Sequence, residues 1–410
     1  MRSRSTGALV LIAILAGLPG NPVRAADPPK RRPFTSEERA AVLGLIKAVD
    51  LAQETDVTSS DLVRWDNHVL KSGDQSAYVP FRLTVGGLPD GVKTAVMYLR
   101  AVLRRDGIRA SDERSAVRDT LLHGTNAAAR LPETMYIGPG EMPVGGPAAG
   151  SSRRSTAAPA EASAILALQQ RAAERQKAAA EATKQKAETK ARDPFLFPFE
   201  DYYLIDLKTG RADAPRILER ALSLPAGDYD VYVALIDRAR LKTSGATIVR
   251  HTVTVPNYWN DELALSSLIL AADVQTLAAP LSPQQQSEHP YTFGHAAVFP
   301  VTADAFTPND VLSVVYQICN YGAPDSDLQA EYNFYRVDEG PRRLFNHTPP
   351  QQFADEDLPP PKAWETQAFA TQAVSLQTFP PGRYELEVIV RDRLTRRSAS
   401  GSVAFTVALR

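Results

Sequence analysis

The feature that most constrains the fold of this chain is a short stretch that occurs twice. It runs from Leu224 to Arg238 and again from Phe379 to Arg393, so each residue of the second copy lies 155 positions after its counterpart. The copies share a proline, a glycine and a tyrosine, which are Pro225, Gly227 and Tyr229 in the first and Pro380, Gly382 and Tyr384 in the second.

Each copy contains a Pro/Gly turn and a strand of alternating residues, and a second strand follows it, at 246–255 and at 402–407. This pattern is typical of the terminal hairpin of an antiparallel sandwich. Tyr229 and Tyr384 are placed where a corner tyrosine can tie the chain as it crosses between sheets. The sequence therefore predicts a mainly β protein with two immunoglobulin-like antiparallel β-sandwich domains, together with an N-terminal helix and an inserted Ala-rich helical spacer.

The first 25 residues read as a signal peptide. Arg2 and Arg4 precede an apolar run, Ala8–Leu18, that is too short to span a bilayer, and small residues around Ala25 suit a signal peptidase. The alternative is a true membrane anchor, which the length of the run disfavours. We expect the protein to be exported, to the periplasm or beyond, with no membrane span after cleavage.

Residues 26–60 should form a tether and an amphipathic helix, in which Thr35 and Glu38 make a capping box. The helix can dock on the first sandwich or on a partner, and internal docking is the favoured alternative. Residues 106–192 combine a Gly/Pro/Ser-rich linker with an Ala/Glu/Lys-rich helix that lacks a heptad seam. This helix is interpreted as a solvated spacer; a partner-binding rod is the alternative.

The remaining sequence is divided into two strand-rich regions. Residues 61–258 should form the first sandwich, interrupted by 106–192, because the strands expected at 62–103 are too few to bury a core alone. A separate small N-terminal domain is the alternative. Residues 259–410 supply further strands at sandwich spacing and should form the second sandwich.

Several segments resemble a family of uncharacterised secreted bacterial β-sandwich proteins. They are Leu265–Ala271, Pro290–Gly294, Glu331–Tyr335, Phe345–Gln351 and Phe379–Tyr384. In some of these proteins a similar tandem β region follows a von Willebrand A-type domain. The resemblance covers roughly 193–410 and more weakly 60–105, and the Asp-x-Ser-x-Ser metal motif of the A-type domain is absent here. It implies a secreted, non-catalytic module without a known ligand.

The sequence carries no familiar catalytic motif. Neither a Gly-x-Ser-x-Gly elbow, a His-Glu-x-x-His pair nor a phosphate-binding Gly-rich loop occurs. A net charge of −1 gives no electrostatic footprint for nucleic acid. Cys319, the only cysteine, is interpreted as a buried hydrophobe rather than a nucleophile or an intermolecular bridge. We therefore expect no enzyme activity, metal or cofactor, although scattered acids and histidines leave an enzyme of unrecognised type as a minor alternative.

Aromatic residues are the best candidates for binding. The candidate positions in the second domain are Tyr291, Phe293, Tyr321, Tyr335 and Trp364. Exposed aromatics on a sandwich stack against sugar rings or act as hot spots for proteins, whereas the competing interpretation places them in the core or the interdomain seam. The sequence favours a structural or protein-interaction module of the cell envelope, with another envelope protein as partner; a carbohydrate-binding module, with a polysaccharide as partner, is the alternative. The oligomeric state stays open.

Overall fold

The computed structural model describes residues 35–55, 63–72, 75–85, 94–104, 115–123, 197–206, 216–237, 245–260, 262–301, 305–321, 327–338, 340–353, 358 and 367–409. The predicted signal peptide, tether, Gly/Pro/Ser-rich linker and Ala-rich spacer lie outside these residues, as does Trp364. The described part is mainly β and consists of antiparallel sheets packed in pairs, which confirms the predicted fold class.

Two four-stranded sheets form the first sandwich. Sheet 1 has the order β5-β4-β7-β8, and sheet 2 has β3 between β6 on one side and β1 and β2 on the other. Their bounds are β1 Val63–Asn67, β2 Leu70–Lys71, β3 Ala77–Val85, β4 Thr94–Leu103, β5 Phe199–Asp206, β6 Arg216–Leu224, β7 Gly227–Asp237 and β8 Thr247–Val255. Strands from 63–103 thus pair with strands from 199–255 in both sheets.

Two six-stranded sheets form the second sandwich. Sheet 3 has the order β11-β12-β10-β14-β18, with β9 also on β14, and sheet 4 has the order β13-β20-β19-β15-β16, with β17 also on β15. The bounds in sheet 3 are β9 Ala264–Leu265, β10 Ile269–Thr276, β11 Thr292–Phe293, β12 Ala296–Pro300, β14 Val311–Cys319 and β18 Gln367–Ser375. Those in sheet 4 are β13 Ala305–Phe306, β15 Leu328–Arg336, β16 Arg343–His347, β17 Gln351–Gln352, β19 Gly382–Asp392 and β20 Arg397–Val407.

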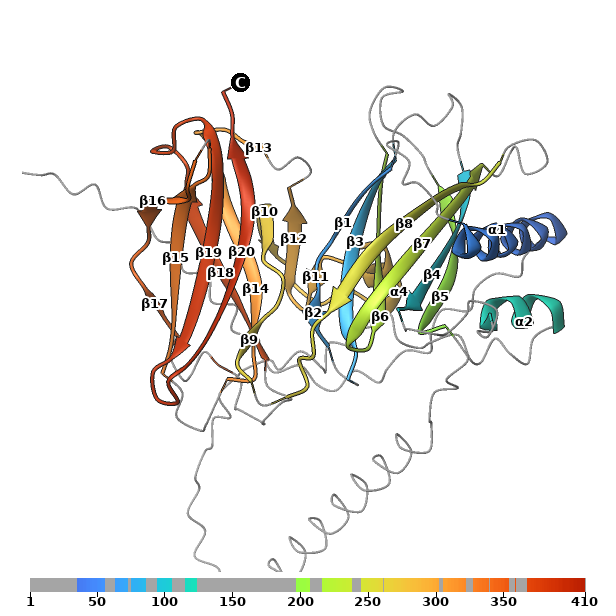
Figure 1. The fold of residues 1–410 in the computed structure, drawn as a ribbon, viewed down its shortest axis with the longest axis horizontal. Coiled ribbons are helices and arrows are strands. Elements are labelled where there is room, and N and C mark those ends of the chain that lie inside the picture. The colour runs from blue at the N-terminus through green and yellow to red at the C-terminus, as the bar shows by residue number, and fades with distance from the viewer. Residues whose placement is uncertain are drawn as a thin grey trace, which may run out of the picture.

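Two of the helices, α1 (Ser36–Glu54) and α2 (Ala116–His123), lie at one end of the molecule (Figure 1). Helix α1 begins with the predicted Thr35–Glu38 capping box, and its stripe of Val42, Leu45, Ile46 and Val49 is buried. Together with α2, it covers the outer face of sheet 1. A third helix, α4, Pro283–Glu288, lies next to β6. None of the described helices is long and apolar enough to cross a membrane.

The layers therefore follow one another in the order helices, sheet 1, sheet 2, sheet 3 and sheet 4 (Figure 1). Strands in the middle of this stack are buried on both faces. On β3, for example, Phe81 points into the first sandwich while Tyr78 points toward sheet 3. Period-2 alternation places each set of side chains in a different core.

Candidate binding surface

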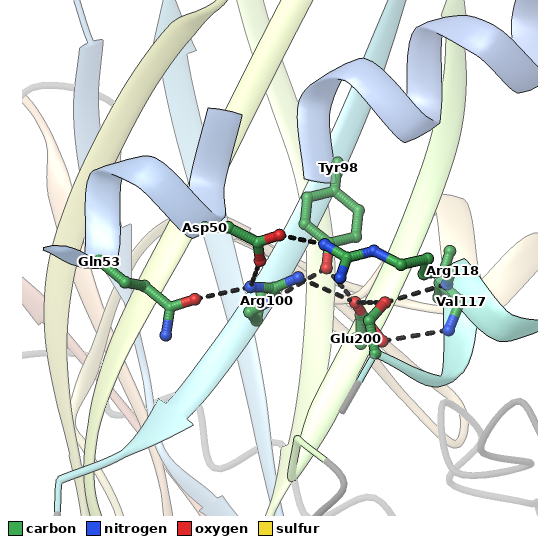
Figure 2. A network of polar contacts seen from close by, with 8 residues as sticks. Asp50, Gln53, Tyr98, Arg100, Val117, Arg118 and Glu200 are labelled. Atoms are coloured by element: carbon green, nitrogen blue, oxygen red, sulfur yellow. Dashed lines mark hydrogen bonds and ion pairs between the residues drawn. The ribbon is translucent and has the colours of Figure 1, made fainter. Parts of the chain in front are cut away.

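The outer face of sheet 1 is closed by a buried polar network (Figure 2). Arg100 on β4 is fully buried, and its guanidinium donates to Asp50 at 2.7 Å and to Gln53 at 2.6 Å, both on α1. Its Nε donates to Tyr98 Oη at 2.8 Å, and the ring of Phe197 lies 4.0 Å from its guanidinium carbon. Burial alone would lower the pKa of Arg100, but Tyr98, Glu200 and Asp50 outweigh this and raise it, so the residue stays charged.

Glu200 on β5 completes this network and anchors the second helix. Its carboxylate accepts hydrogen bonds from Tyr98, from Ser115 Oγ at 2.6 Å and from the backbone N–H of Val117 at 3.1 Å. The Val117 amide belongs to the first turn of α2, where a carboxylate is favoured by the helix dipole. The network therefore holds both helices on sheet 1, and its role is structural.

The outer faces of sheets 2 and 3 cover one another in a seam between the sandwiches. Leu70, Tyr78 and Ala221 of sheet 2 pack against an apolar set from the second sandwich that includes Ile269 and Val315. Polar groups lock the two sides together. The backbone N–H of Lys71 donates to Gln317 Oε1 at 2.7 Å, and Gln317 Nε2 donates back to the Lys71 carbonyl at 3.1 Å.

Three of the aromatic candidates, Tyr291, Phe293 and Tyr321, are buried, where the competing interpretation places them. Tyr291 lies in the seam, where His68 Nδ1 is 3.1 Å from its hydroxyl, and Phe293 lies beside it, stacked on Phe369 at 5.0 Å. Tyr321 is buried in the core of the second sandwich. For Tyr291 and Phe293 the physical reason is that the face of sheet 3 that would meet water in a single sandwich meets sheet 2 here, whereas Tyr321 packs inside its own sandwich.

The repeated turns tie the chain in both sandwiches. Tyr229 Oη donates to the Pro225 carbonyl at 2.8 Å, and Tyr384 Oη donates to the Pro380 carbonyl at 2.7 Å. Gly227 has a φ of +148°, which strongly favours glycine, and a Cβ at this position would lie 2.8 Å from Leu103 Cδ1. Both hydrogen bonds span four residues, so the tyrosines fix each turn in the manner of a corner tyrosine.

Each of the four sheets has one face that points away from the core of its own sandwich. Among the described residues, none covers this outer face on sheet 4, which is the last layer of the stack (Figure 1). Tyr335 on β15 lies on this face, directly opposite Leu344 of β16, whose side chain is 57 % exposed. The guanidinium carbon of Arg342 lies 3.6 Å from the centroid of the Tyr335 ring. This arrangement places an aromatic ring, a guanidinium and an aliphatic side chain side by side at the surface.

Two carboxylates complete this group. Arg342 forms ion pairs with Glu385 at 3.3 Å and with Glu387 at 3.0 Å, and Tyr335 Oη donates to Glu387 at 3.1 Å. Burial alone would raise the pKa of Glu387, but hydrogen bonds from Arg342 and Tyr335 outweigh it and lower the pKa. We call Tyr335, Arg342, Leu344, Glu385 and Glu387 the Tyr335 patch. Sequence reasoning found Tyr335 but missed Arg342 and Leu344, because only the cross-strand register brings them to it.

The residues with reactive side chains do not form a catalytic or metal-binding cluster in the described part of the chain. No group of three or more His, Cys, Asp and Glu that could hold a metal ion gathers there. Cys319 is buried against the first sandwich, and burial raises the pKa of its thiol to about 12, so the unreactive thiol form dominates. His295 Nδ1 lies 3.0 Å from the Leu277 carbonyl. The acidic stretch 355–357 lies outside the described residues.

Comparisons with known proteins give no family. No family model matches the chain, and no curated protein matches it. Among solved structures, red sea bream transglutaminase is 7% identical with a TM-score of 0.19, covering 89% of this chain and 33% of that one. Bacteroides uniformis β-glucuronidase is 10% identical with a TM-score of 0.23, covering 82% and 27%.

A third solved structure, Escherichia coli α-2-macroglobulin activated by porcine elastase, is 9% identical with a TM-score of 0.16, covering 86% of this chain and 22% of that one. The chain thus spans a third or less of the length of these three proteins. The resemblance to secreted proteins with von Willebrand-associated β regions is not tested by these matches and stays a prediction.

Proposed function

We propose that this protein is a non-catalytic interaction module of the cell envelope and that it binds another protein through the outer face of sheet 4. One observation carries the proposal: the chain covers three of its four outer sheet faces with its own helices or its other sandwich, within the described residues, and leaves the fourth open. The open face carries the Tyr335 patch.

The chemistry of the patch favours a protein as the ligand. Tyr and Arg are enriched among residues that dominate protein–protein binding energy, and Leu344 adds an exposed apolar contact beside them. The ion pairs of Arg342 with Glu385 and Glu387 hold the aromatic and the guanidinium in place. A preorganised patch loses less side-chain entropy when a partner binds, which raises its affinity.

The carbohydrate-binding alternative has weaker support. A sugar ring stacks on a free aromatic face, and one face of Tyr335 is occupied by Arg342 at 3.6 Å. Tyr291, Phe293 and Tyr321 are buried and offer no platform. A location in the envelope is supported by the signal-peptide pattern of residues 1–25, in particular Arg2, Arg4 and the apolar run that follows.

Crosslinking in the native cell, followed by quantitative mass spectrometry of the purified tagged protein, tests the proposal. We expect Arg342→Glu to reduce recovery of a stoichiometric partner protein at least about tenfold, since a buried charge clash at a hot spot costs more than 1.4 kcal/mol. Leu51→Glu, at a position on α1 that is 62 % exposed, is the matched control and should leave recovery unchanged. Equal recovery with both variants, or recovery of polysaccharide alone, would refute the proposal.

A further inference from the structure

Strand β20 forms a long edge of sheet 4. It pairs with β19 along its whole length, from Arg397 opposite Asp392 to Val407 opposite Gly382. On its other side the described residues provide one partner, the two-residue strand β13, which is paired only with Thr406 and Val407. The stretch 398–404 therefore has no strand partner on this side within the described part of the chain.

The backbone of this stretch presents hydrogen-bonding groups in a known order. The amide of Ala408 donates to the Phe306 carbonyl of β13 at 2.8 Å, so even-numbered residues of this strand direct N–H and C=O away from β19. Backbone groups alternate sides along a strand, and the register with β19 is uninterrupted. The N–H and C=O groups of Ser398, Ser400, Ser402 and Ala404 accordingly point to the open edge.

This edge also lacks the features that prevent natural edge strands from pairing with strands of other molecules. From Ser398 to Val407 the strand contains no charged residue and no proline, and it has no bulge against β19. The counterpart in the first sandwich, β8, carries Arg250 and His251. A long, uncharged edge without a bulge is a template for another strand, because its unpaired backbone groups gain partners without any charge being desolvated.

We propose that the strand which pairs with β20 is β20 of a second copy of this chain, antiparallel to it about a two-fold axis at Ser400. In this register Ser400 faces Ser400 of the second copy, and Ser398 faces Ser402. The side chains of these residues are exposed on the outer face of sheet 4, and their backbone N–H and C=O groups point to the open edge of the sheet. The two edges therefore form about six new backbone hydrogen bonds.

Two features of the chain favour this register. Moving the axis to Gly401 would bring Arg396 opposite Thr406, and moving it to Ser402 would bring Ser398 opposite Thr406, a position that β13 already occupies. Moving it toward the start of the strand would engage the turn at 393–396, in which Arg396 has a φ of +59°. Self-pairing also explains the composition, since small uncharged serines face one another without a steric or charge conflict. The dimer would join two copies of sheet 4 into one continuous sheet.

Disulfide crosslinking of the full chain tests both the pairing and the register. Facing residues of a hydrogen-bonded pair have Cα atoms about 5.5 Å apart, which is within the range of a disulfide. Under mild oxidation we expect Ser400→Cys to become mostly covalent dimer on a non-reducing gel. Ser402→Cys alone should give less than about a tenth of this, and the double variant Ser398→Cys/Ser402→Cys should crosslink again. Cys319 is fully buried and adds no background.

Sedimentation equilibrium gives an independent measurement. Proline at position 400 removes only the backbone N–H that points to the open edge, so Ser400→Pro should leave the pairing with β19 intact. It should raise the dissociation constant of the dimer at least about tenfold. If this variant does not fold, Ser400→Lys, which places two like charges opposite each other, serves instead. A chain that stays monomeric at about 100 μM, equal crosslinking by Ser400→Cys and Ser402→Cys, or crosslinking only to a different protein would each overturn the proposal.

Discussion

The two copies of the repeated hairpin have the same backbone architecture but different outer faces. Three outward positions of β7, Tyr232, Ala234 and Ile236, lie under α1 and α2 in an apolar cluster. At the same positions β19 has Glu387, Ile389 and Arg391, on the open face of sheet 4. The inward positions are apolar in both copies. The repeat therefore preserves what builds a sandwich, whereas the outer face differs according to what covers it.

The largest expected effect is a difference in the free energy of unfolding between two arginine variants, one under the helices and one on the open face of sheet 4. Arg100→Met removes the charge that balances buried Glu200 and should lower the free energy of unfolding by about 3–5 kcal/mol. Arg391→Met breaks the exposed ion pair with Glu331 in sheet 4 and should change it by less than about 1 kcal/mol. Urea denaturation of both variants measures the difference. Similar losses would show that the helix-side network is no more important than a surface pair.

A second comparison uses pH. Burial, and to a lesser extent Arg82, lowers the pKa of His68 in the seam from 6.5 to about 4. As the pH falls below 6.5 the unfolded chain binds a proton that the folded chain refuses, so stability is lost until about pH 4, where the folded state binds it too. Between about pH 7.5 and 5 the free energy of unfolding should fall by about 2 kcal/mol.

Denaturation of matched variants at both pH values checks this assignment. His68→Gln should remove most of that part of the pH dependence, whereas His347→Gln, at an exposed position of sheet 4, should keep it. A pH profile unchanged by His68→Gln would contradict the assignment of the proton to the seam.

A third comparison concerns the two turn glycines. Gly227→Ala must place a Cβ at a φ of +148° and 2.8 Å from Leu103, so it should cost about 2 kcal/mol. Gly382→Ala would approach the exposed side chains of Asp338 and Arg336, at 3.1 and 3.2 Å, which can move away, so we expect less than about 1 kcal/mol. Thermal unfolding distinguishes them; a larger cost at Gly382 would reverse the expected order.

The smallest expected effect tests the equivalence of the two turns. Tyr229→Phe and Tyr384→Phe each remove one hydrogen bond to a proline carbonyl, at 2.8 and 2.7 Å, and each should cost about 1 kcal/mol. Equal losses in urea denaturation would mean that both tyrosines act alike. A difference of more than about 1 kcal/mol would show that the turns have diverged in energetic role.

Local patterns in the sequence were sufficient to predict much of the fold. The capping box at Thr35, the apolar runs of β3 and β4 and the repeated turn residues each act over a few positions, and the structure contains all of them. Strand β6 was missed because Glu219 and Arg220 interrupt its apolar pattern, and its pairing with β3 is set by residues far away in the sequence.

The binding candidates were harder to predict for a related reason. The sequence pattern places a side chain such as Phe293 outside the core of its own sandwich, but it gives no information on whether water or a second sandwich lies beyond. A signal was present in β3, where Tyr78 and Val79 are both apolar, since a strand without polar alternation is typically buried on both faces. The Tyr335 patch depends on cross-strand register, which a single sequence does not specify.

The mutual hydrogen bonds between Lys71 and Gln317 have a mechanical consequence. Because they join backbone groups of Lys71 in the first sandwich to the buried side chain of Gln317 in the second, we expect the seam to resist sliding of one sandwich on the other. With sheets spaced at about 10 Å, α1 and the open face of sheet 4 lie roughly 40 Å apart at opposite ends. A molecule held at its α1 end would thus present the Tyr335 patch at a fixed distance from its point of attachment.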